Sequence, residues 1–214
     1  MGSSPRVSAK CTKRRAVVNA GKFDENAQMA AQPKTILTYR EYLELERTSE
    51  HKLEWLAGEA WSMAGGTITH ARMAANVTGS LVAALRGRPC AVFSSDLKVR
   101  VTQTDRSTYP DITVICGKPE AAADDPNAAV NPIVVVEVLS ESTEASDRGE
   151  KFAHLQRLES LREYVLVNQR TQRVEVFRRA ENAWELRSYE KGSFELTSLQ
   201  ITLKVEELYA DPTA

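Results

Sequence analysis

One carboxylate interrupts the most apolar segment of this sequence. Glu137 lies within residues 133–139, and every other residue of that segment is Ile, Val or Leu. Burial of a carboxylate costs free energy unless a cation or hydrogen-bond donors compensate it. Two interpretations are therefore open: Glu137 forms a structural ion pair with an Arg or Lys, or it binds a hard cation, which prefers oxygen ligands.

Asp111 is a second carboxylate, and it favours the cation site. It follows Pro110 directly and precedes the apolar segment 112–116, so Pro110 restricts the backbone that enters this position. An Asp beside a Pro is by itself often only a turn residue. Two carboxylates at adjacent strand positions, however, are a donor set that holds Mg²⁺ or Mn²⁺ together with water and phosphate oxygens. Such a cation activates water and neutralises the charge that develops on a phosphodiester during its cleavage.

Patterns in the first half of the chain predict the elements that precede Asp111. A capping-box pattern at 38–41 begins a short amphipathic helix. Residues 52–63 alternate around Ala57-Gly58, as two strands joined by a tight turn do. Apolar residues at helical spacing predict a long helix over 70–86.

The second half of the chain is rich in strand patterns. Apolar, β-branched runs predict strands at 91–93, 97–101, 112–116, 133–139, 164–168 and 173–178, with shorter ones within 184–189 and 194–203. Segment 133–139 does not alternate, which is typical of a central strand covered on both faces. Asp147 and Glu150 begin a further helix. We therefore predict one domain over 35–210, with an α/β fold of a mixed central β-sheet flanked by α-helices.

Composition limits the classes of function. The chain has 214 residues, and its 28 Lys and Arg are balanced by 29 Asp and Glu. This balance argues against a protein that coats nucleic acid indiscriminately through an overall positive charge. No apolar run reaches about 18 residues and no signal-peptide pattern is present, which predicts a cytoplasmic protein without a membrane partner. The sequence has no Walker loop or dinucleotide fingerprint, so we expect no small-molecule organic cofactor. The three cysteines are far apart, and we expect neither a disulfide framework nor a zinc site.

The first 34 residues differ from the rest of the chain. Residues 1–28 carry six Lys or Arg and two acids, and they show no apolar periodicity. This composition predicts a disordered basic arm over 1–34. Met29 lies just before the first patterned segment. The alternative interpretation is that the natural protein starts at Met29.

Several motifs together resemble a known family. In chain order they are EWLAGE at 54–59, MAGG at 63–66, His70, SDLKVR at 95–100, YPD at 109–111, VVEVLS at 135–140, DRGEKF at 147–152 and LREYVLV at 161–167. This order of motifs resembles the Uma2 family of restriction-endonuclease-like proteins, in the PD-(D/E)XK nuclease superfamily. The resemblance covers nearly all of 35–208 and implies an Mg²⁺- or Mn²⁺-dependent endonuclease that hydrolyses DNA by attack of activated water.

The resemblance assigns the metal ligands. It implies that Asp111 and Glu137 bind the metal, with the main-chain carbonyl of Val138 as a third ligand. Glu54 matches the family's upstream acidic position, where it would complete the metal site or position the water. The alternative for Glu54 is a charged residue on the exposed face of a hairpin.

The resemblance also leaves one catalytic position to be filled. The superfamily has a lysine two residues after the Glu, and this chain has Leu139 there. Lys151 is the natural substitute, because it lies one turn inside the next helix and could stabilise the attacking hydroxide or the transition state. The alternative is that Lys151 extends from the apolar face of its helix to solvent.

Three further residues are candidates for substrate binding. His70 matches a family histidine, although a His in a first helical turn is more often a local hydrogen-bonding residue. Lys98 and Arg100 share a strand face and could hold phosphates, or they could belong to a solvated sheet edge. We expect DNA as partner and a homodimer, because duplex DNA has two-fold geometry. The alternative function is a non-catalytic module of nuclease fold that binds nucleic acid or a protein.

Overall fold

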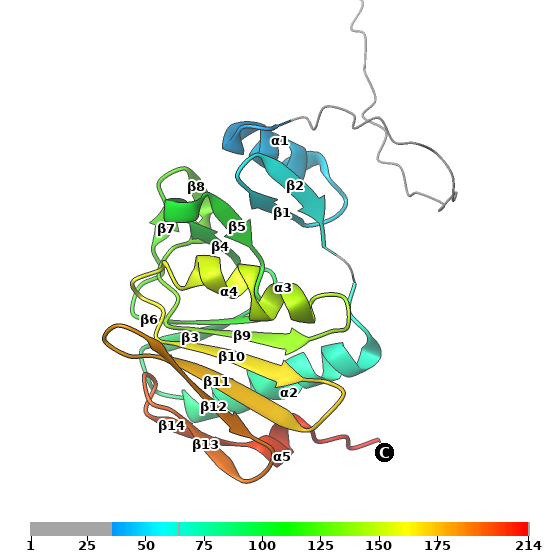
Figure 1. The fold of residues 1–214 in the computed structure, drawn as a ribbon, viewed down its shortest axis with the longest axis vertical. Helices are drawn as coiled ribbons and strands as arrows, with labels where there is room; N and C mark the ends of the chain where they lie inside the picture. Colours follow the sequence, from blue (N-terminus) through cyan, green and yellow to red (C-terminus); the bar gives the residue numbers. More distant parts are fainter. Residues whose placement is uncertain (1–35, 64, 214) are drawn as a thin grey trace, which may run out of the picture. The chain divides into compact units, whose positions relative to one another are not determined.

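A computed structural model of the chain describes residues 36–63 and 65–213. These belong to one compact unit, Thr35–Ala214, shown in Figure 1. The basic arm predicted for 1–34, with Met29, lies outside the described residues. The elements are α1 Tyr39–Thr48, β1 Leu53–Leu56, β2 Glu59–Ser62, α2 Ile68–Ala84, β3 Cys90–Ser94, β4 Lys98–Val101, a 3₁₀ turn Thr102–Thr104, β5 Arg106–Thr108, β6 Ile112–Cys116, β7 Ala121–Ala122, β8 Asp125–Ala129, β9 Val134–Leu139, α3 Glu144–Arg148, α4 Glu150–Leu155, β10 Glu163–Asn168, β11 Arg173–Arg179, β12 Trp184–Tyr189, β13 Ser193–Leu196, β14 Ile201–Lys204 and α5 Val205–Leu208.

The strands form two six-stranded sheets and a hairpin. One sheet has the order β12-β11-β10-β9-β6-β3 and is mixed, because β9 and β10 are parallel and the other neighbours are antiparallel. The second has the order β2-β1-β5-β4-β8-β7, and β13 pairs with β14. The predicted α/β fold with a mixed sheet flanked by helices is confirmed. The strands are nevertheless divided between two large sheets, because β5 pairs with β1 of the first hairpin and β4 pairs with β5 instead of extending the sheet around β9.

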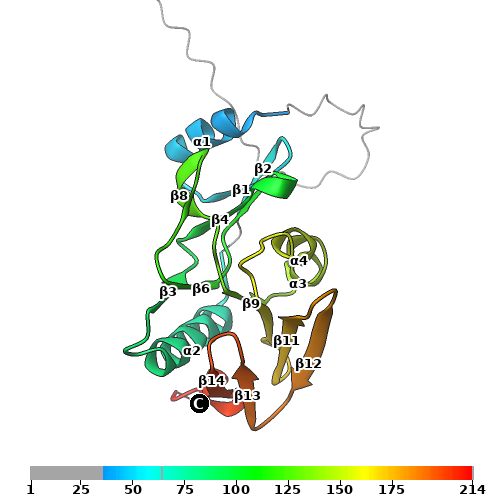
Figure 2. The ribbon, with the colours of Figure 1, turned by 90° about the vertical axis from the view of Figure 1, so that its left-hand side faces the viewer.

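Strand β9 is central and is covered on both faces, as its sequence predicts. Val134, Val136 and Val138 belong to one apolar cluster with α2. Val135 and Leu139 belong to another cluster with α4. Figure 2 shows α2 on one side of this sheet and α3 and α4 on the other. Because side chains alternate along a strand, Glu137 lies on the face covered by α3 and α4.

Helix α2 packs through Met73, Val77 and Leu81, which are buried at helical spacing. It begins earlier than predicted, because the hydroxyl of Thr67 accepts a hydrogen bond from the His70 amide and caps the helix. This cap places His70 in the first turn. No helix in the described ranges has both the length and the apolar character needed to cross a membrane.

Helix formation after β9 also starts before the predicted position. It begins at Glu144 and is interrupted at Gly149, whose φ of −111° and ψ of −95° are not helical. Two short helices, α3 and α4, therefore replace the single helix predicted from Asp147. Asp147 and Lys151 still lie at an i,i+4 spacing across the interruption.

The first hairpin and α1 form a small aromatic core. The turn between β1 and β2 has positive φ at Ala57 (45°) and Gly58 (102°), as the sequence predicts. Trp55 of β1 is buried against Tyr39 and Tyr42 of α1, whose capping box is formed as predicted. Glu54, the neighbour of Trp55 in β1, points to the opposite face of the strand and is also buried.

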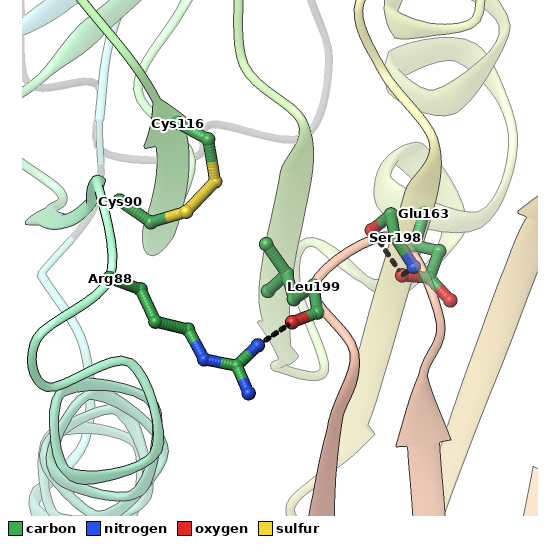
Figure 3. The surroundings of a disulfide bond; sticks show 6 residues. All are labelled: Arg88, Cys90, Cys116, Glu163, Ser198 and Leu199. Atoms are coloured by element: carbon green, nitrogen blue, oxygen red, sulfur yellow. Dashed lines mark hydrogen bonds between the residues drawn. A yellow bond between two sulfur atoms is a disulfide. The ribbon is translucent and has the colours of Figure 1, made fainter.

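The structure contradicts the expectation that the cysteines are unpaired. Strands β3 and β6 pair so that Cys90 lies directly opposite Cys116, with 3.9 Å between their Cα atoms, and the two form a disulfide (Figure 3). The expectation was wrong because the two residues are far apart in the sequence and only the strand register brings them together.

Candidate functional site

The two predicted metal ligands lie side by side at the end of the β6–β9 pair. The register places Ile112 opposite Val136, so Asp111 is next to Glu137. The Asp111 amide donates to Glu137 Oε2 at 3.3 Å, and the Val138 amide donates to Asp111 Oδ2 at 2.8 Å. Main-chain groups thus hold both carboxylates in place.

Lys151 reaches this pair from α4. Its Nζ lies 2.7 Å from Glu137 Oε1, and the two side chains are 8% and 3% exposed. Lys151 therefore does not extend to solvent. It is also the cation required by the structural interpretation of Glu137, so the ion pair of that interpretation lies within the candidate site.

Asp147 belongs to the same cluster, although the sequence indicated only that it begins a helix. Its Oδ1 lies 3.6 Å from Lys151 Nζ, and the side chain is 6% exposed. The i,i+4 spacing of an Asp and a Lys at a helix start is the sequence signal that identifies this contact.

Glu54 is buried close to the cluster and is fully occupied by hydrogen bonds. Its Oε2 accepts from Arg106 Nη2 at 2.9 Å, and its Oε1 accepts from the Thr108 hydroxyl and from the Tyr109 amide at 3.2 Å. Oε1 also lies 3.8 Å from Lys151 Nζ. The exposed hairpin position considered for Glu54 is not what the structure shows. With both oxygens used, Glu54 fits a role in holding Lys151 better than one as a cation ligand.

His70 faces Asp111 from the start of α2. Its Nε2 lies 3.1 Å from Asp111 Oδ2. A Cβ atom added to Gly66 would lie 2.8 Å from Nδ1 of the imidazole, so the absence of a side chain at Gly66 lets the ring pack against the preceding loop. The hydrogen bond to Asp111 raises the pKa of His70, against the effect of burial, and the Val138 carbonyl adds to the increase.

The raised pKa of His70 predicts a pH-dependent contribution to stability. A group whose pKa is higher in the folded state stabilises the fold below its unfolded pKa of about 6.5, and this stabilisation is lost as pH rises through the folded pKa. We expect the free energy of unfolding of His70→Gln to differ most from wild type at about pH 5 and least at about pH 9. Urea titrations of the metal-free protein measure this difference.

His154 supplies the control, because burial lowers its pKa and Arg106 lowers it further. Its contribution is lost as pH falls, so the difference between wild type and His154→Gln should have the opposite slope. A His70→Gln difference that does not change with pH would contradict the assignment.

The clustered side chains open into a cleft of about 710 Å³. Hydroxyl and amide groups form much of its rim, and Arg170 and Glu141 form an ion pair of 3.0 Å there. The described residues that line it are Met63, Gly65, Gly66, Thr67, Thr69, His70, Tyr109, Asp111, Glu137, Ser140, Glu141, Ser142, Thr143, Asp147, Lys151, Gln169 and Arg170. Asp111, Glu137, Asp147 and Lys151 thus line a cleft that opens to the outside of the protein.

Lys98 and Arg100 do not line the cleft, contrary to the sequence-based expectation of a phosphate contact. Lys98 is buried in ion pairs with Glu46 and Asp125, the latter at 2.7 Å. Arg100 pairs with Asp105 at 2.7 Å and with Asp124 at 2.9 Å. Neither residue belongs to a solvated edge, because both side chains are only 4% exposed. They link the second sheet to α1 and to its loops.

Negative charge predominates in the cluster. Three carboxylates, those of Glu54, Glu137 and Asp147, surround Lys151, and Asp111 lies next to Glu137. Among the described residues, Arg106 is a second permanent cation in contact with this group, through Glu54. Burial raises the pKa of Glu137 well above its usual value and also raises the pKa of Asp147, while the Lys151 charge opposes both increases. An additional cation at this position would relieve the repulsion among the carboxylates.

The donor set fits a hydrated hard cation better than a closed metal cage. Among the described residues, no three His, Cys, Asp or Glu side chains form a group that could hold a metal ion. Both side-chain hydrogen bonds of Asp111 use Oδ2, so Oδ1 accepts none from the described residues. Mg²⁺ commonly takes one or two carboxylates and completes its shell with water and phosphate oxygens. Asp111 and Glu137 match this requirement.

A mixed sheet with adjacent carboxylates on neighbouring strands and a lysine on the covering helix defines a restriction-endonuclease-like α/β domain. The Uma2 family model, described as "Putative restriction endonuclease", matches residues 39–207. The chain belongs to the Uma2 family, and the resemblance of its motifs to that family is confirmed.

Two further proteins and a solved structure are also similar to this chain. Two Synechocystis sp. proteins are similar along most of their length: sll1609 is 32% identical over 144 residues (67% of this chain, 81% of sll1609), and slr1290 is 30% identical over 175 residues (81% of this chain, 91% of slr1290). The crystal structure of a "putative nuclease belonging to DUF820" from Anabaena variabilis has a TM-score of 0.67 at 18% identity, covering 81% of this chain and 97% of that one. The two proteins share a fold.

Proposed function

We propose that this protein is an Mg²⁺- or Mn²⁺-dependent endonuclease that hydrolyses phosphodiester bonds in DNA. The observation that carries the proposal is the contact set of Asp111, Glu137 and Lys151. Two carboxylates on adjacent strands and one ammonium meet at an open cleft, and the carboxylates outnumber the cations around them. Membership of the Uma2 family supports a nuclease-like function.

Each residue of the cluster has a chemical role in this proposal. Asp111 and Glu137 would hold the divalent cation, which activates water and neutralises charge on the phosphate. Lys151 Nζ, next to Glu137, stabilises negative charge on the attacking oxygen and on the transition state. His70 fixes the orientation of Asp111 through its hydrogen bond to Oδ2. Glu54 holds Lys151 at the edge of the cluster.

Cleavage of supercoiled plasmid DNA tests the function. We expect wild-type protein to cut in Mg²⁺ or Mn²⁺ and not in EDTA, and Asp111→Asn to lose about a hundredfold or more of the rate. Circular dichroism confirms that the variant is folded. Linear product formed without a nicked intermediate would support the proposed homodimer, because two sites would cut both strands.

Two results would overturn the endonuclease proposal. Cleavage that is equal in EDTA and in Mg²⁺ would exclude a role for the cation. Binding of the cation and of DNA without cleavage of duplex, single-stranded or RNA substrates would indicate the non-catalytic binding module instead.

A further inference from the structure

Lys151 has three carboxylates within ion-pair distance, and they differ in what else they do. Glu137 at 2.7 Å is also a proposed cation ligand. Glu54 at 3.8 Å is engaged by Arg106, Thr108 and the Tyr109 amide. Asp147 at 3.6 Å is neither a proposed ligand nor paired with another cation in the described residues. Among these three carboxylates, Asp147 is therefore the one that Lys151 shares neither with another described cation nor with the proposed bound cation.

The charge on Lys151 needs such a partner as soon as a cation binds. A divalent cation held by Glu137 would share the negative charge that Lys151 uses in the metal-free protein, and it would place two further positive charges near the ammonium. Like charges at this distance repel strongly in a buried site. Glu54 shares its charge with Arg106, so without Asp147 the Lys151 ammonium would be held less firmly against the cleft.

The backbone around Asp147 is held rigidly. Its carbonyl accepts a hydrogen bond of 2.9 Å from the hydroxyl of Tyr164, which is fully buried and stacks on Phe152 with ring centroids 4.6 Å apart. The Asp147 amide donates to the Thr143 carbonyl at 2.8 Å. Asp147 is thus fixed relative to both β10 and α4, as a group that orients another side chain must be.

We propose that Asp147 is a positioning residue that holds the Lys151 ammonium against the cleft while a cation occupies Asp111 and Glu137. Asp147 acts through Lys151 and does not itself contact the cation. The proposal rests on the nuclease function for its catalytic consequence, but the coupling between Asp147 and Lys151 exists in the metal-free protein.

A double-mutant cycle in the metal-free protein tests this coupling without any activity measurement. Urea unfolding of wild type, Asp147→Asn, Lys151→Met and the double variant gives the interaction free energy between the two side chains. We expect Asp147→Asn to lower the unfolding midpoint in the wild-type background and to raise it or leave it unchanged in the Lys151→Met background, because an unpaired buried carboxylate is then removed. Additive effects would overturn the proposal.

Glu150→Gln is the matched control for the cycle. Glu150 also carries one negative charge beside Lys151 on α4, but its side chain is 57% exposed and makes no ion pair with Lys151. Its effect should be additive with Lys151→Met. Coupling of the same size at Glu150 and Asp147 would show a general charge effect and would overturn the specific role of Asp147.

Cation binding and cleavage separate a positioning residue from a ligand. We expect Asp147→Asn to change Mn²⁺ affinity, measured by calorimetry, by less than about threefold, and to lower kcat by about tenfold to a hundredfold at a nearly unchanged KM for DNA. Asp147→Glu, which restores the charge, should recover part of kcat. If Asp147→Asn does not fold, Asp147→Glu replaces it in the double-mutant cycle with Lys151→Met.

The outcomes are distinguishable from failure of the proposed function. Loss of Mn²⁺ affinity in Asp147→Asn as large as in Asp111→Asn would make Asp147 a ligand and overturn the proposal. If wild type cuts no DNA, the nuclease function fails, and the cycle and the Mn²⁺ titration still decide whether Asp147 positions Lys151.

Discussion

Lys151→Met is expected to lower the free energy of unfolding of the metal-free protein by about 3 kcal/mol at about pH 8, and to reduce DNA cleavage by about a hundredfold or more. Methionine keeps the length of the side chain and removes the ammonium that lies 2.7 Å from Glu137 Oε1. Glu137, which is 3% exposed, then has no cation at that distance. The destabilisation should be smaller at about pH 5, because the raised pKa of Glu137 lets it take up a proton and lose its buried charge.

A double variant separates the stability effect of Lys151→Met from its effect on chemistry. Removing both charges, as Lys151→Met with Glu137→Gln, should restore most of the stability, since a buried ion pair replaced by neutral groups often costs little. Cleavage should remain absent. Urea titration and plasmid cleavage measure the two properties. If Lys151→Met alone were as stable as wild type at about pH 8, Lys151 would not compensate the buried charge of Glu137.

Glu137→Gln is expected to abolish cation binding and cleavage while changing the free energy of unfolding of the metal-free protein by less than about 1 kcal/mol. The asymmetry with Lys151→Met follows from the remaining partners. Lys151 keeps Asp147 at 3.6 Å and Glu54 at 3.8 Å, and the cost of burying the Glu137 charge disappears. Mn²⁺ calorimetry, plasmid cleavage and urea titration measure the three properties.

Glu163→Gln is the matched control for Glu137→Gln. Glu163 is also a fully buried glutamate, on the neighbouring strand β10, but its oxygens accept from Arg178, Thr197 and Ser198 away from the cleft. Its substitution should destabilise the fold and leave Mn²⁺ affinity unchanged. Equal loss of Mn²⁺ affinity in both variants would indicate a general effect of destabilisation and refute Glu137 as a ligand.

Much of the candidate site could be predicted from sequence because its residues depart from their surroundings. Glu137 stands out as a carboxylate in an apolar strand, and Asp111 stands out beside Pro110 at the start of another. The family motifs then single out Lys151. The structure brings these three residues together with Glu54 and His70.

Other features depended on contacts that sequence spacing does not encode. Lys98 and Arg100 share a strand face as predicted, but carboxylates from α1, from β8 and from the turns before β5 and β8 pair with them there. Cys90 and Cys116 became partners only through the register of β3 and β6. Asp147 was recognised as a helix residue at i,i+4 from Lys151, but only the packing of α4 places this pair beside Glu137 and Glu54.

Local properties of the chain therefore determined the helices, the strands and the unusual carboxylates, because periodicity, capping and turn preferences act over a few residues. Tertiary structure decided which charges are neutralised and which remain in the cleft. Ion pairing depends on distances of a few ångströms between residues far apart in the sequence, and strand register and helix packing set those distances. Two lysines therefore differ in role: Lys98 is a buried structural cation, and Lys151 lines the cleft.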